Sequence, residues 1–81
     1  MTALNTVPPG RCVRIVRVDA GRGMQMQLKS MGLREGDSIK VLSSMQGRII
    51  LAKGNLRIAV GRGMSFRIFV EEDKETLCDT A

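Results

Sequence analysis

The sequence predicts a small, mainly β domain in which five short strands form a closed or nearly closed barrel, with one short α-helix between strands 1 and 2. Its 81 residues are enough for a single domain. Short runs rich in β-branched residues recur along the chain, and turn signals separate them. Only one stretch has helical spacing. Strands this closely spaced favour a barrel, because closure leaves few open sheet edges.

The first strand is predicted at residues 11–18, directly after the turn signal Pro8-Pro9-Gly10. It contains four valine and isoleucine residues, and arginine recurs between them. Part of each strand face can therefore meet water. The segment 19–23 contains two glycines and ends the strand.

The helix is predicted from Met24 to Met31. Met24, Leu28 and Met31 are spaced at i, i+4 and i+7, so they share one face. Gly32 follows, where a helix end favours a residue that tolerates the left-handed conformation. Leu33 is then placed to fold back onto the last turn, as apolar residues often do after such a cap.

The remaining strands are short and separated by tight turns. Gly54-Asn55 is a two-residue hairpin signal. In the last strand, Phe66 and Phe69 are expected on opposite faces. The four strands are predicted at residues 38–43, 48–53, 56–60 and 66–70.

The net charge of +5 is unevenly distributed. Residues 1–70 hold twelve Lys and Arg against three Asp and Glu, whereas residues 71–81 hold one Lys against five acids. The scattered basic residues are typical of a soluble β-protein that protects its sheet edges. We therefore expect one domain over residues 1–81, with its core at about 4–71 and a flexible acidic tail at 72–81.

The composition excludes several classes of function. The chain has no His, Trp or Tyr, so it lacks the usual general base and the commonest transition-metal ligand. The segment Gly21-x-Gly23 lacks the third glycine of the dinucleotide-binding motif, since Met26 stands there, and no nucleotide-triphosphate loop is present. We predict no catalytic residue, no cofactor site and no metal site. The acids of the tail would collect divalent cations only weakly.

The sequence predicts a cytoplasmic protein that does not insert into a membrane. Its first nine residues have neither the basic start nor the apolar run of a signal peptide, and no apolar stretch is long enough to span a bilayer. Cys12 and Cys78 lie far apart and do not form the disulfide framework of a small secreted domain.

Four residues are the candidates for a partner-binding surface. Met26 lies off the apolar stripe of the helix, and Met45 is expected at a hairpin turn, so both can be exposed. Methionine suits adaptable binding surfaces, although it also fills irregular cores. Lys29 and Arg34, on the helix and its following turn, would meet an acidic partner face.

The order of the motifs resembles that of the FeoA family, small cytoplasmic accessory proteins of bacterial ferrous iron transport. The resemblance covers about residues 4–71 and implies an SH3-like barrel. It implies that the chain binds the FeoB membrane permease, which has a cytoplasmic GTPase domain, and supports or regulates iron uptake without carrying iron or cleaving GTP. The motifs that carry it are Leu28-x-x-Met31-Gly32-Leu33-x-x-Gly36-Asp37, Arg57-Ile58-Ala59-Val60-Gly61 and Ile68-Phe69-Val70.

Two alternatives stay open. A basic β-barrel can bind nucleic acid, but only Phe66 and Phe69 are aromatic and at most one of them could stack on a base, so we expect no nucleic-acid partner. The same fold occurs as the C-terminal domain of metal-dependent repressors, so the chain could be a stand-alone relative of that domain. Direct binding of a transition metal ion and the oligomeric state also stay open.

Overall fold

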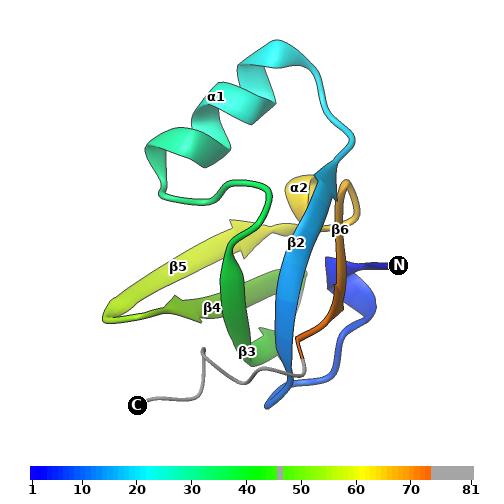
Figure 1. Ribbon diagram of the computed structural model, residues 1–81, viewed down its shortest axis with the longest axis vertical. Coiled ribbons are helices and arrows are strands. Elements are labelled where there is room, and N and C mark those ends of the chain that lie inside the picture. The colour runs from blue at the N-terminus through cyan, green and yellow to red at the C-terminus, as the bar shows by residue number, and fades with distance from the viewer. Residues whose placement is uncertain (46, 74–81) are drawn as a thin grey trace.

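The computed structural model describes residues 1–45 and 47–73 and shows a twisted antiparallel sheet with one longer helix over one end (Figure 1). The elements, in chain order, are β1 (Thr2–Ala3), the 3-10 turn η1 (Leu4–Thr6), β2 (Cys12–Val18), α1 (Arg22–Ser30), β3 (Ser38–Met45), β4 (Arg48–Lys53), β5 (Leu56–Gly61), α2 (Arg62–Ser65) and β6 (Ile68–Glu72).

The strands of the described residues form one sheet in the order β1-β6-β2-β3-β4-β5, and every neighbouring pair is antiparallel. The register shifts between Ile15 and Arg17 in β2 and between Val41 and Ser43 in β3. Bulges of this kind increase the local twist and bend the strand, so the sheet curves around its own core. The sheet is not closed, because β5 and β1 remain its two ends.

The core lies between the curved sheet and the helices. Alternate strand residues point into the core. Leu28 of α1 and Leu33, which follows the helix, cover the end of the core beneath α1. Met24 and Met31 pack against this core from α1, as the helical spacing predicted. The buried core residues are Leu4, Val7, Val13, Ile15, Leu28, Leu33, Ile39, Val41, Ile49, Leu51, Ile58, Val60, Ile68 and Val70.

The mainly β fold and the helix between the first two predicted strands are confirmed, and two short elements are added. The sequence did not predict β1, which pairs with β6, or α2, which follows β5 directly. Because α2 occupies residues 62–65, the last strand begins at Ile68 and not at Phe66. Phe66 and Phe69 therefore do not share one strand, and neither is among the buried core residues.

The C-terminal part of the described chain extends beyond the expected core. The acidic tail was predicted to begin at residue 72, whereas β6 ends at Glu72 and Asp73 is 4% exposed. The rest of the predicted tail, residues 74–81, lies outside the described residues, as does Gln46 of the predicted hairpin turn. No helix in the described part of the chain is long and apolar enough to cross a membrane.

The prediction about the cysteines falls partly on Cys78, which also lies outside the described residues. Cys12 lies half-buried on β2 and is not a free thiol.

Candidate partner-binding surface

The C-terminal end of α1 is fixed by a Schellman cap. Gly32 adopts a φ of 92°, which a residue without a Cβ reaches with little strain. The Leu33 N–H donates to the Leu28 carbonyl over 2.9 Å, and the Gly32 N–H donates to the Lys29 carbonyl over 3.0 Å. These are the two hydrogen bonds of that motif, and Leu33, 2% exposed, supplies its apolar contact. The cap predicted at Gly32 and Leu33 is confirmed.

The turn after the helix is closed by Asp37. Its Oδ2 accepts a hydrogen bond from the Arg34 N–H over 2.7 Å, and the Asp37 N–H donates to the Arg34 carbonyl over 3.1 Å. The Gly36 N–H donates to the carbonyl of Ile15 on β2 over 2.7 Å. The turn is thus closed on itself and also tied to the sheet.

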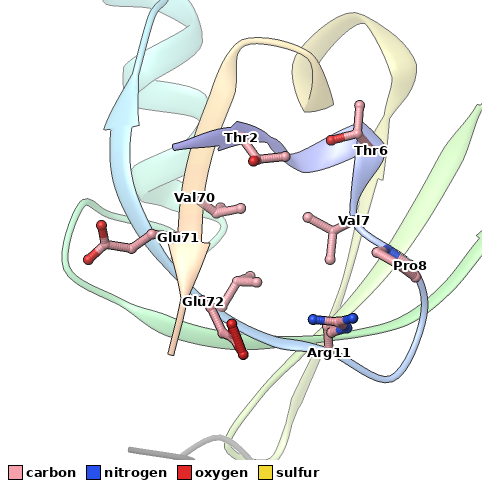
Figure 2. A pocket seen from close by; sticks show the side chains of 9 residues that line it. Thr2, Thr6, Val7, Pro8, Arg11, Val70, Glu71 and Glu72 are labelled. Carbon is pink, nitrogen blue, oxygen red and sulfur yellow. The ribbon is translucent and has the colours of Figure 1, made fainter. Parts of the chain in front are cut away.

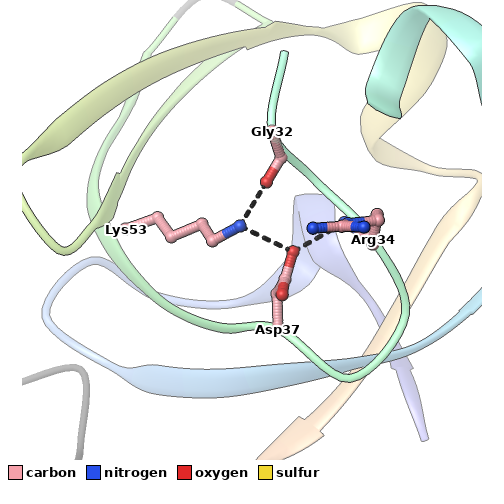
Figure 3. A network of polar contacts seen from close by, with 4 residues as sticks. All are labelled: Gly32, Arg34, Asp37 and Lys53. Atoms are coloured by element: carbon pink, nitrogen blue, oxygen red, sulfur yellow. Dashed lines mark hydrogen bonds and ion pairs between the residues drawn. The ribbon is translucent and has the colours of Figure 1, made fainter. Parts of the chain in front are cut away.

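Lys53, at the end of β4, joins the cap to the turn (Figure 3). Its Nζ donates to the Gly32 carbonyl over 2.5 Å and forms an ion pair with Asp37 Oδ2 over 3.0 Å. Both charged side chains are partly buried, and hydrogen bonds between charged groups are stronger than those between neutral groups. This role of Lys53 could not be predicted from the sequence, because nothing local to Lys53 indicates that it faces the helix end.

The structure brings Lys29 and Arg34 together. Both line a depression of about 290 Å³ between α1 and the turn, whose floor is formed by Leu28 and Leu33. Met26 lies on the outer side of the same helix, opposite Leu28, and is 63% exposed. We define these three residues, Met26, Lys29 and Arg34, as the α1 surface.

Met45 lies elsewhere. It is the last residue of β3, the strand that leads away from the turn after α1, and it is 71% exposed (Figure 1). It borders a different depression, of about 390 Å³, with Ser43, Arg48 and Ile50. Met45 is thus exposed, as expected, but the structure does not join it to the α1 surface.

A third depression, of about 240 Å³, lies between the N-terminal segment and β6 (Figure 2). Val7 and Val70 supply its apolar walls, and Arg11 and Glu72 place opposite charges at its rim. Glu71 forms an ion pair with Arg14. Among residues 1–45 and 47–73, no group of three or more His, Cys, Asp or Glu is placed to hold a metal ion.

The aromatic residues do not form a stacking platform. Phe66 is exposed, and the guanidinium of Arg67 lies over its ring at 5.0 Å from the centroid. Phe69 is half-buried within β6. The expectation that the two phenylalanines lie on opposite faces of one strand is wrong, because α2 moves Phe66 out of the strand.

Comparisons with known proteins agree with this architecture. A family model described as the FeoA domain matches residues 2–72. A protein named "Putative Fe(2+) transport protein A" from Methanocaldococcus jannaschii is 36% identical over 63 residues, which cover 78% of this chain and 77% of that protein.

Solved structures support the predicted SH3-like fold. The crystal structure of an iron uptake regulatory protein, FeoA, matches with a TM-score of 0.80 and 36% identity, over 89% of this chain and 96% of that one. The manganese regulator SloR matches with a TM-score of 0.78 and 19% identity, over 89% of this chain and 34% of that one. The likeness to SloR is one of fold alone. None of these comparisons indicates an enzyme.

Proposed function

This chain belongs to the FeoA family, and from that premise we propose that it acts in ferrous iron uptake as an accessory protein that docks on a FeoB-type membrane permease. The names of its relatives, an Fe(2+) transport protein and an iron uptake regulatory protein, support the role in iron uptake. Docking on the cytoplasmic GTPase domain of the permease would place the protein in the cytoplasm, without insertion into the membrane.

The observation that carries the proposal is the α1 surface on its fixed support. The Schellman cap, the Asp37 turn and Lys53 hold α1 in one position on the sheet. A surface that is already ordered loses less conformational freedom on binding. Met26 offers apolar contact area, and Lys29 and Arg34 place two positive charges around the depression against the one negative charge of Glu35. An acidic partner face with an apolar centre would complement this arrangement.

A binding experiment tests the proposal. The full-length permease and, separately, its soluble cytoplasmic domain are used to capture the wild-type chain and two variants, Met26→Lys and Met45→Lys. Both variants add one positive charge at an exposed methionine, so they are matched controls for each other. We expect Met26→Lys to weaken capture about tenfold, since the core of an interface rarely holds a lysine, and Met45→Lys to weaken it little.

A physiological experiment tests the role in uptake. Deletion of the gene should lower the uptake of ferrous iron and leave the uptake of ferric iron unchanged. Normal ferrous uptake in the deletion strain, or equal capture of the wild-type chain and Met26→Lys, would contradict the proposed function.

A further inference from the structure

The two ends of the sheet differ greatly in the length of strand that they expose. At one end, β1 contains only two residues and continues directly into η1. At the other end, β5 contains six residues. A short edge strand gives an incoming chain little to pair with, whereas a long regular one is a template for another strand.

The β5 edge is regular along its whole length. Its pairing with β4 runs from Lys53↔Leu56 to Arg48↔Gly61 without a shift in register. It contains no proline, and its only charged side chain is that of Arg57. Bulges, prolines and several charges are the usual means of blocking an edge, so β5 is only weakly blocked.

The outward backbone groups of β5 can be identified from the hairpin. The two-residue turn Gly54-Asn55 makes Lys53 and Leu56 a hydrogen-bonded pair, and such pairs alternate along an antiparallel ladder. Arg57, Ala59 and Gly61 therefore direct their N–H groups away from β4. In the part of the chain that the structure describes, no backbone hydrogen bond outside the ladder involves Arg57 or Ala59.

We propose that a second copy of this chain pairs with this edge, β5 against β5, about a two-fold axis at Ala59. In that register Ala59 opposes Ala59 of the second copy, and Arg57 opposes Gly61 of the second copy. The small residue at each opposed position leaves room for the approach, and no arginine faces an arginine. On the inner face, Ile58 comes opposite Val60 of the second copy, so an apolar row crosses the joint.

The sheet order explains why the pairing would stop at two copies. Pairing of β5 with β6 of another copy would be heterologous and would continue into a ring or filament. However, β6 lies between β1 and β2: β2 pairs along one of its edges, and β1 pairs with Phe69 and Val70 on the other, so only a short stretch of β6 is left for another strand (Figure 1). The other end of the sheet, β1, offers only two residues, so the β5 edge of a second copy is the longest partner for β5, and this pairing gives a closed dimer.

The salt dependence of the dimer should differ from that of partner docking, because different charges meet in the two contacts. The outer face beside the joint carries the exposed side chains of Arg48 and Arg57, and no acidic residue belongs to β3, β4 or β5. Dimerisation brings two such faces together, so salt should strengthen the dimer by screening their repulsion. The proposed contact between the α1 surface and an acidic partner should instead weaken with salt. The inference does not depend on the proposed function.

The oligomeric state of the full chain tests the proposal, measured by analytical ultracentrifugation over a range of protein and salt concentrations. We expect a concentration-dependent dimer that is favoured at high salt. The variant Ala59→Lys places two ammonium groups face to face at the axis and should weaken the dimer tenfold or more. Gln27→Lys adds the same charge on the exposed side of α1 and should leave the dimer unchanged.

A second variant covers the case in which Ala59→Lys does not fold. Proline is tolerated on an edge strand where the N–H faces outward, so Ala59→Pro should keep β5 in its ladder and remove both hydrogen bonds at the axis. Hydrogen exchange at the Arg57 and Ala59 amides of the wild-type chain should slow as the dimer forms.

Three results would overturn the proposal. The first is the mass of a single chain at every protein and salt concentration. The second is a dimer that both Ala59 variants leave intact, which would place the contact on another face. The third is slow exchange of the Arg57 and Ala59 amides in a molecule with the mass of one chain, which would show that another segment of this chain covers the edge.

Discussion

The two exposed methionines, Met26 and Met45, stand on different kinds of support. The helix that carries Met26 ends in a cap and a closed turn, and the hydrogen bonds of Lys53 join this end of α1 to the end of β4. Met45 ends β3 beyond a bulge, where the described ladder pairs it with Arg48 of β4. Both methionines are exposed, so exposure alone does not distinguish the two surfaces. They differ in how many hydrogen bonds hold the backbone that carries each methionine.

The substitution Leu33→Ala should have the largest effect on this difference. Leu33 is 2% exposed and forms the apolar part of the cap, so its truncation should lower the free energy of unfolding by about 2–5 kcal/mol. The control Leu42→Ala removes the same atoms from a side chain that is 37% exposed at the β3 bulge, and should cost less than about 1 kcal/mol. Urea unfolding measures both, and equal losses would mean that the α1 support is not the stronger one.

Removal of the Lys53 ammonium should have an intermediate effect. The variant Lys53→Met keeps the length of the side chain but leaves the Gly32 carbonyl and one contact of the Asp37 carboxylate without a donor, and should cost about 1–3 kcal/mol. Lys29→Met, at an exposed position, should change stability by less than about 0.5 kcal/mol.

Hydrogen exchange locates the effect of the Lys53 variant. The Leu33 amide, which donates to Leu28, should exchange faster in Lys53→Met, and the amides of the β3–β4 ladder should not. A uniform increase over the whole domain would mean that Lys53 supports the entire fold and not the helix end in particular.

The smallest effect is expected from Met26→Lys and Met45→Lys on stability. Both side chains are mostly exposed, so each variant should change the free energy of unfolding by less than about 0.5 kcal/mol. Thermal unfolding measures the stability of both variants. The capture experiment reports on binding only if this stability is unchanged. A large loss for Met26→Lys would show that Met26 packs against the domain and is not available to a partner.

Local patterns predicted most of the fold. The helix and its cap follow from the spacing of Met24, Leu28 and Met31 and from the Gly32-Leu33 pair, because an i, i+4 stripe and a left-handed residue act within a few positions. The hairpin at Gly54-Asn55 is equally local.

The features that depend on contacts between distant segments could not be predicted from the sequence. α2 contains Gly63 and follows Gly61, and glycine disfavours a helix, so its single turn depends on its packing against β4, β5 and η1. Lys53 reaches Gly32 across 21 positions, and no spacing rule relates them. Of the candidate site, the exposure of Met26 and Met45 could be predicted, but their separation on the surface could not.

The place of β6 between β1 and β2 has a consequence for how the chain folds. Strands β3, β4 and β5 follow one another as hairpins, so they can pair as soon as each is made. β2 differs from these strands, because one of its edges pairs with β6, which is made last. In that pairing Val13 lies opposite Glu72. Until translation has reached β6, a strand of seven residues, five of them apolar, keeps one side of its backbone unpaired. That interval is when a nascent chain of this protein is most exposed to aggregation and has most need of a chaperone.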